Sequence, residues 1–218
     1  MVGSVIWPRR TRWEKGCGRN RDFLCPVRVR VVRHGVMRKL ITTLLMSLDG
    51  VVSAPERLLP MWDDEAKRYA IGELDECDAL LFGRATYQSF ARRWPTVRDD
   101  EFADRLNARS KYVVSRSLHE ATWVHTTLIH GDVAGELSAL KHQPGKNIMK
   151  YGIGELDEAL FASDLVDEIR VSVVPIVLGE GRRFLEGSAH RTRLDLRLDH
   201  LHRFRNGIVR LSYAVGYI

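Results

Sequence analysis

The stretch DALLFGRATYQSFARRWP, residues 78–95, holds the first groups in the chain that could do chemistry. Its apolar run, Ala79–Phe82, is typical of a buried strand, Gly83 marks a turn, and a helical pattern begins at once. Such a turn leaves backbone N–H groups unpaired at a helix N-terminus, where their partial positive charge can hold a phosphate. The N–H groups concerned are those of Arg84, Ala85 and Thr86, and the Arg84 guanidinium would add a bidentate donor. The alternative is an ordinary strand-to-helix connection.

Further turns of this kind follow other apolar runs. They are Leu48-Asp49-Gly50, Ser115-Arg116-Ser117, and Gly152-Ile153-Gly154, which leads into a helix through Glu155 and Leu156. Glycine at a helix start suits a pyrophosphate, whereas the hydroxyls and guanidinium of residues 115–117 suit a phosphate monoester. Ser-Arg-Ser could equally be a solvated turn. The pair of glycines at 152 and 154 lacks the third glycine and the first-strand position of a dinucleotide fingerprint, so the pattern excludes a Rossmann fold.

The elements that must position these turns can be predicted from periodicity. We expect strands at 39–47, 79–82, 111–114 and 147–151, one or two short strands within 122–130, and a β-rich segment at 165–177. We expect helices at 63–77, after residue 83, and at 99–107, 132–142 and 155–161. Strands at 193–203 and 207–215 should form a hairpin, because Asn206-Gly207 between them is a hairpin signal.

This order predicts an α/β fold with three layers. Its mixed, mostly parallel sheet should be flanked by helices and end in an antiparallel C-terminal hairpin. Ligands of open α/β sheets bind at the carboxyl ends of the strands, so we expect the four turns to meet at one edge.

The positive charge is concentrated at the start of the chain. The 218 residues carry a net charge of +6, but residues 1–38 hold ten basic side chains against two acidic ones. The remaining 180 residues carry 24 basic and 26 acidic side chains. We therefore assign residues 1–36 to a poorly ordered basic extension and residues 37–218 to one domain, and we do not expect this nearly neutral domain to bind nucleic acid. Attachment of nucleic acid through the extension is a separate possibility.

The cysteines and the apolar runs bear on the compartment. Cys17, Cys25 and Cys77 form no CxxC pair, and their odd number without a signal peptide indicates a reducing cytoplasm. We place Cys77 at a helix end and expect no metal site. No apolar run approaches the roughly 20 residues that a membrane-spanning helix needs.

Four segments together resemble the dihydrofolate-reductase-like superfamily: GRATYQSF, YVVSRS, YGIGEL and LVDEIRVSVVPIVLGEGRRFLEG. The similarity is greatest to the branch that contains the C-terminal reductase domain of the bifunctional riboflavin-biosynthesis deaminase/reductase, together with stand-alone proteins of unassigned substrate. It covers about residues 37–215 in the expected order, and residues 1–36 lie outside it.

The resemblance implies an NADPH-dependent reductase of a small heterocycle, similar to 5-amino-6-(5-phosphoribosylamino)uracil reductase or dihydrofolate reductase. It implies that residues 83–86, beginning with Gly83, hold the cofactor's phosphates, and that Ser115 and Arg116 take the 2′-phosphate. The turn from Gly152 to Leu156 would cover the pyrophosphate and nicotinamide half, although the bulk of Ile153 departs from the family's small residue there. Members of this branch are often homodimers that pair through their C-terminal strands, so we expect a homodimer here.

Hydride transfer also requires a proton donor, and Asp49 is the candidate at the end of the first strand. Partial burial should raise the pKa of its carboxyl group. The alternatives are that Asp49 orients the substrate or a loop, or bonds its own loop backbone, because Asp-Gly is a common turn pair.

The substrate is constrained less well. Trp62 and Tyr87 could wall a planar ring together with Phe90 and Trp94, but the helical spacing of the last three equally predicts packing against the sheet. Riboflavin-pathway reductases carry a lysine where this chain has Thr43, which argues against their substrate. A non-catalytic nucleotide-binding or regulatory module on the same fold is the second interpretation.

Overall fold

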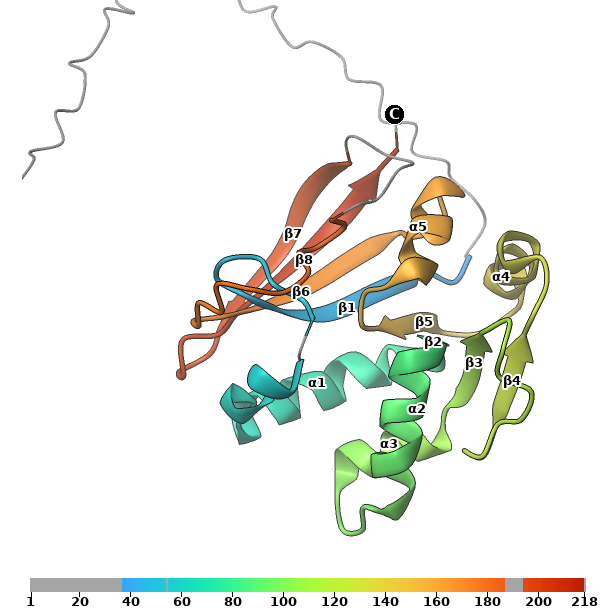
Figure 1. The fold of residues 1–218 in the computed structure, drawn as a ribbon, viewed down its shortest axis with the longest axis horizontal. Helices are drawn as coiled ribbons and strands as arrows, with labels where there is room; N and C mark the ends of the chain where they lie inside the picture. The colour runs from blue at the N-terminus through green and yellow to red at the C-terminus, as the bar shows by residue number, and fades with distance from the viewer. Residues whose placement is uncertain (1–36, 54, 187–193, 218) are drawn as a thin grey trace, which may run out of the picture.

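The computed structural model describes residues 37–53, 55–186 and 194–217. The basic extension expected at residues 1–36 lies outside the described residues, as do Cys17, Cys25 and any nucleic-acid attachment through that segment. The described residues form one eight-stranded sheet in the order β4-β3-β2-β5-β1-β6-β8-β7 (Figure 1).

The sheet is mixed, as predicted. Neighbouring strands from β4 to β6 are parallel, and β8 pairs antiparallel with both β6 and β7. The strands are β1 (Leu40–Ser47), β2 (Cys77–Gly83), β3 (Ser110–Val114), β4 (Thr126–Ile129), β5 (Asn147–Tyr151), β6 (Glu168–Val174), β7 (Asp195–Arg203) and β8 (Val209–Gly216). The C-terminal hairpin is confirmed, and Gly207 at its turn has a φ of +89°, which favours glycine.

Helices cover both faces of the sheet, so the three-layer α/β architecture is confirmed (Figure 1). One face carries α1 (Asp64–Asp75), α2 (Arg84–Arg93) and α3 (Glu101–Ala108), and the other carries α4 (Val133–His142) and α5 (Glu155–Ala162). Short 3-10 turns occur at Pro55–Arg57, Leu59–Met61 and Trp94–Thr96. Within the described part of the chain, every helix is too short or too polar to cross a lipid bilayer.

Side chains alternate between the two faces along each strand, which builds one apolar core on each side. In β2, Leu81 packs with the α4 and α5 side, whereas Leu80 and Phe82 pack with the α1, α2 and α3 side. The aromatic stripe of α2 belongs to the second core, because Tyr87 is buried there and Phe90 and Trp94 pack against it. This confirms the packing interpretation of the stripe.

Two of the predicted helices begin at carboxylate N-caps, but one helix end was predicted wrongly. Asp63 caps α1 by accepting a hydrogen bond of 2.9 Å from the Ala66 N–H, and Asp100 caps α3 in the same way. The helix predicted to run to Cys77 ends at Asp75, and Cys77 is the first residue of β2. Its pairing with Asn147 on β5 draws the chain into the sheet two residues earlier than the apolar run indicated.

A buried network of charges, rather than apolar contact alone, attaches α1 to the C-terminal half of the sheet. The Arg210 guanidinium of β8 donates to both carboxylate oxygens of Glu73 on α1, at 3.0 and 2.7 Å. It also donates to Thr43 Oγ1 at 2.7 Å and Ser172 Oγ at 3.1 Å. Arg170 on β6 lies 3.3 Å from Glu73 and ties in two further carboxylates, those of Glu168 and Glu76. Burial of charge costs free energy unless every group is paired, so the network holds α1 in one register.

We predict that Arg210→Met lowers the free energy of unfolding by about 3–5 kcal/mol, because it leaves the buried Glu73 carboxylate short of its bidentate partner. Urea unfolding followed by circular dichroism would measure the loss. The double variant Arg210→Met, Glu73→Leu should recover most of it, since neither charge then remains. Arg203→Met, at an exposed arginine on β7, is the matched control and should cost less than about 0.5 kcal/mol. A single-variant cost as small as that of the control would contradict a structural role for the network.

Candidate functional site

Four turns meet at the carboxyl edge of the sheet, as the sequence predicts. They follow β3, β2, β5 and β1, which are consecutive in the sheet order. Gly83 pairs with Val114, so β2 and β3 end level with each other. Thr43 pairs with Tyr151 at the end of β5, so β1 continues four residues further, to Ser47. The turns at Gly83, Ser115 and Gly152 therefore lie side by side, and the Asp49 turn lies beyond them at the end of β1.

The N-terminus of α2 presents free backbone donors. Gly83 is its N-cap, no side chain caps the first turn, and that turn contains no acidic residue. Arg84, the first residue of the helix, is exposed, and so is Ala85. The first turn can therefore offer N–H groups and a guanidinium to an anion.

The turn after β5 lies directly against α2. Gly152 has a φ of +76°, and a Cβ at this position would lie 2.8 Å from Thr86 Oγ1. A Cβ on Gly83 would lie 3.9 Å from the Leu156 Cβ, so the two turns touch at a second point. Only glycine satisfies both the backbone angle and the close approach at residue 152. Ile153 packs against the core on the α4 and α5 side, so its bulk points away from the α2 contact.

A buried ion pair between Lys150 and Asp157 holds the backbone of this turn. Lys150 Nζ lies 2.7 and 2.8 Å from the two carboxylate oxygens of Asp157 and donates to the Gly152 carbonyl at 2.6 Å. Asp157 in turn accepts from the Gly154 N–H at 2.7 Å. Lys150 is 2% exposed and Asp157 is fully buried, and burial lowers the pKa of the lysine while the carboxylate opposes that effect. The pair fixes the turn between β5 and α5.

The turn after β3 is an ordered Ser turn that exposes an arginine. The Ser115 hydroxyl accepts from the N–H groups of Ser117 and Leu118, at 3.2 and 3.0 Å, and keeps its own hydrogen to donate. The Arg116 side chain is exposed. The structure thus places Arg116 one strand away from the uncapped N-terminus of α2.

Asp49 fastens a loop, which we name the strap, residues 176–186. Its carboxylate accepts from the N–H groups of Leu178 and Gly179, at 3.1 and 2.8 Å, and from the Ser47 hydroxyl at 2.6 Å. Further backbone bonds join residues 48–53 to the strap, including Val52 N–H to the Arg182 carbonyl at 2.9 Å. Arg182 also donates to the Ile153 carbonyl at 2.9 Å, which ties the strap to the glycine turn.

The expectation of a raised pKa at Asp49 is wrong. The hydrogen bonds from Ser47, Leu178 and Gly179 all stabilise the charged carboxylate and hold its pKa far below the ordinary value of 3.8. Desolvation acts in the opposite direction but is outweighed. The structure matches the alternative interpretation, in which Asp49 orients a loop.

The two residues predicted to contact the substrate, Tyr87 and Trp62, differ in their exposure to solvent. Tyr87 is 2% exposed and its hydroxyl accepts from the Trp123 N–H at 3.0 Å, so it is occupied by packing. Trp62 is partly exposed beside the start of α1 and packs against two core clusters.

Sequence reasoning did not select Tyr151, the last residue of β5. Its ring stacks on Phe82, with ring centroids 6.0 Å apart and 15° between the planes, and lies 5.3 Å from Phe90. Its hydroxyl makes no hydrogen bond with any residue that the structure describes. Burial, and to a lesser degree the charge of Glu73, raise the pKa of this hydroxyl well above its ordinary value. Its place immediately before Gly152 was the available signal.

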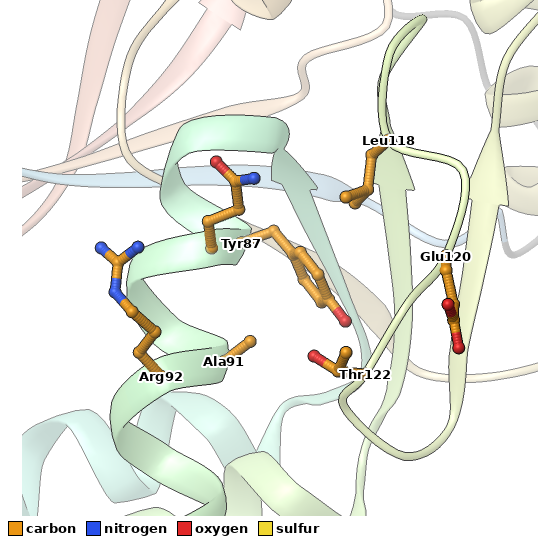
Figure 2. A pocket seen from close by; sticks show the side chains of 7 residues that line it. Tyr87, Ala91, Arg92, Leu118, Glu120 and Thr122 are labelled. Atoms are coloured by element: carbon orange, nitrogen blue, oxygen red, sulfur yellow. The ribbon is translucent and has the colours of Figure 1, made fainter.

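A hollow of about 280 Å³ lies beside the site rather than in it (Figure 2). It opens between α2 and the segment joining β3 to β4, and its lining includes Tyr87, Arg92, Leu118, Glu120 and Thr122. None of the glycine turns contributes to it. No group of three or more His, Cys, Asp or Glu side chains within residues 37–53, 55–186 and 194–217 is arranged to hold a metal ion.

We predict that Asp49 stabilises the protein only where its carboxylate is charged. Because folding lowers its pKa, the stability it contributes is present above about pH 4, the unfolded value, and is lost as pH falls below it. Wild type should therefore have a higher Tm than Asp49→Asn at pH 7, and the difference should shrink steadily between pH 5 and pH 3 when thermal unfolding is followed by circular dichroism. Equal melting temperatures at pH 7, or a constant difference at all pH values, would contradict the anchoring role.

Comparisons with known proteins identify a family and a fold. The family model of the RibD C-terminal domain matches residues 38–210. An uncharacterized Bacillus subtilis protein, YyaP, is 27% identical over 180 residues, which are 81% of this chain and 94% of that protein.

Solved structures share the fold. A pyrimidine reductase-like protein from Corynebacterium diphtheriae aligns with a TM-score of 0.64 at 15% identity, over 83% of this chain and 93% of that one. Dihydrofolate reductase from Enterococcus faecalis, complexed with NADP(H), aligns with a TM-score of 0.53 at 14% identity, over 81% of this chain and 96% of that one. The fold is dihydrofolate-reductase-like, and the protein belongs to the RibD C-terminal domain family.

Proposed function

We propose that the protein is an NADPH-dependent reductase that transfers a hydride to a small heterocyclic substrate. The observation that carries the proposal is the contact of the Gly152 turn with the first turn of α2, at the edge where Arg116 also lies. Membership of the RibD C-terminal domain family and the dihydrofolate-reductase-like fold support an oxidoreductase.

The residues present suit a dinucleotide phosphate. A Cβ at Gly152 would collide with the Thr86 side chain, so glycine lets the β5 turn lie against α2. The free N–H groups of α2 with Arg84 suit a pyrophosphate. Arg116 and the Ser115 hydroxyl suit the 2′-phosphate monoester. Gly154, Glu155 and Leu156 at the start of α5 would border the nicotinamide half of the cofactor. When bound, the cofactor would supply the hydride, and the protein's part is to hold it and the substrate in reacting geometry.

The remaining groups at the edge divide the other tasks. We assign to Asp49 the orientation of the strap that covers the β1 end, because its carboxylate already accepts three hydrogen bonds. Tyr151 stands at the substrate position, with its ring fixed by Phe82 and Phe90 and its hydroxyl protonated at neutral pH. A phenol in this state can donate a hydrogen bond to a ring nitrogen or carbonyl of a planar heterocycle. Trp62 would border the same space.

The second candidate is a nucleotide-binding module without turnover. Two observations favour this candidate. Tyr87, expected to contact the substrate, is buried and bonded to Trp123, and Asp49, expected to donate a proton, is bonded to the strap. A cofactor that binds but is never oxidised, across a panel of pterins, pyrimidines and quinones, would decide for this candidate.

We also propose that two copies associate through β7, the edge strand of the sheet. Leu196, Leu198 and Leu201 are 40%, 48% and 54% exposed. Their pairing with β8 puts them on the face opposite α1, and the described helices of that face lie toward the other edge of the sheet (Figure 1). A row of leucines on an edge strand is exposed in a monomer and is buried if a second copy packs there.

Binding of NADPH to the purified protein tests the proposed cofactor. We predict that Arg116→Ala weakens the binding of NADPH but not the binding of NADH. The substitution should weaken NADPH by about 10- to 100-fold, because a charge-assisted hydrogen bond to the 2′-phosphate is lost, and should leave NADH nearly unchanged. Nicotinamide fluorescence and thermal shift give the two dissociation constants. Arg68→Ala, at an exposed arginine of α1, is the matched control. Equal weakening of both cofactors would remove Arg116 from the 2′-phosphate site, and no NADPH binding to wild type would refute the proposed function.

We predict that Leu198→Lys converts a dimer into a monomer, because the new charge would have to be buried in the interface. Size-exclusion chromatography with light scattering measures the mass. His200→Lys introduces the same side chain on the same strand but on the face toward α1, and should leave the dimer intact. A wild-type protein that is monomeric at micromolar concentration would contradict the proposed interface.

A further inference from the structure

Two exposed histidines, His119 and His130, lie beside the Ser115–Arg116 turn. His130 follows the last residue of β4, and its Nδ1 is 2.7 Å from the Ser115 carbonyl oxygen. The His119 ring stacks on the His130 ring, with centroids 6.5 Å apart and 27° between the planes. The turn assigned to the phosphate monoester is therefore attached to one imidazole and flanked by a second.

The contact with Ser115 fixes the hydrogen on one ring nitrogen of His130. A carbonyl oxygen only accepts, so Nδ1 carries the hydrogen and donates it. The opposite nitrogen, Nε2, is then the one that gains a proton when the pH falls. A metal would need a third ligand, and the described residues offer no such group around the pair. An anion is the ligand that two imidazoles beside an arginine can share.

We propose that His119 and His130 complete the 2′-phosphate site and make its affinity depend on pH. This inference rests on the proposed NADPH-dependent function and deepens it: the protonated imidazoles attract the phosphate monoester that distinguishes NADPH from NADH. Preference for NADPH then rises as the pH falls and the imidazoles gain protons.

Other charged side chains near the two histidines also affect the binding of a phosphate. Residues 115–136, which contain the pair, carry one cationic and three anionic side chains: Arg116, Glu120, Asp132 and Glu136. Asp132 is the N-cap of α4, and Glu136 turns back toward Gly131, 3.9 Å from where a Cβ would stand. Protonation of the histidines adds up to two positive charges beside Arg116, which increases the attraction for a dianion.

The test is the ratio of the NADH and NADPH dissociation constants between pH 8.5 and pH 6.5, where the phosphate itself stays largely dianionic because its second pKa is about 6. If binding raises one histidine pKa by about one unit, the ratio increases about five-fold over this range. The variant His119→Gln, His130→Gln should show a flat ratio. His142→Gln is the matched control, because His142 is also exposed with Nδ1 bonded to a backbone carbonyl, that of Ser138, at the far end of α4.

A second measurement separates this inference from the reductase function. In proton NMR titrations of wild-type protein, 2′,5′-ADP should raise the pKa of His119 and His130, whereas 5′-AMP, which lacks the 2′-phosphate, should not. Clear preference for NADPH with a ratio that does not change with pH, or histidine titrations that 2′,5′-ADP leaves unshifted, would overturn the histidine role while leaving NADPH binding in place. Absence of binding by NADPH and by 2′,5′-ADP at every pH would overturn the proposed function as well.

Discussion

The ion pair between Lys150 and Asp157 lies wholly inside the protein, and the turn at residues 152–154 is built around it. A buried lysine needs a counter-charge, and this one comes from the third residue of the helix that follows. The same carboxylate binds the Gly154 N–H, and the same ammonium binds the Gly152 carbonyl. Both ends of the turn are thereby fixed, which allows Gly152 to approach Thr86 at a distance that no other residue permits. The contact between the β5 turn and α2, on which the whole site depends, follows from one pair of charges.

The N-termini of α2 and α5 differ in the negative charge that surrounds them, and Asp157 of the ion pair is part of that difference. The first turn of α5 contains Glu155, Asp157 and Glu158, and Asp157 already occupies the N-cap donor. The first turn of α2 contains no acid and begins with Arg84. Both helices point their positive ends at the same edge, but only α2 does so without competing negative charge. The proposed anionic ligand would therefore bind at α2, and α5 would supply shape and a boundary rather than charge.

Much of this arrangement could be predicted from the sequence, because short-range patterns specify it. The buried strands and the Asn-Gly hairpin each depend on neighbouring residues, and the parallel order then brings the carboxyl ends of the strands to one edge. Long-range partners could not be predicted. No residue near Asp49 in the sequence predicts its contact with the strap, because the N–H donors of Leu178 and Gly179 lie about 130 positions later. The attachment of Glu73 to Arg210 is equally remote, with 137 positions between them.

Asp49 and Tyr151 show how distant residues affect the pKa and the hydrogen bonding of a side chain. A carboxylate at the mouth of a sheet looks like an acid, yet three hydrogen bonds keep Asp49 charged, so it has no proton to give at neutral pH. A tyrosine beside a glycine turn looks like packing, yet its hydroxyl makes no hydrogen bond with the described residues, and burial raises its pKa further above neutral pH. In both residues the environment strengthens the ionisation state that the side chain ordinarily has at neutral pH. Tyr151 therefore adds a hydrogen-bond donor at this edge, on the strand next to β1 and at the residue that precedes the glycine turn.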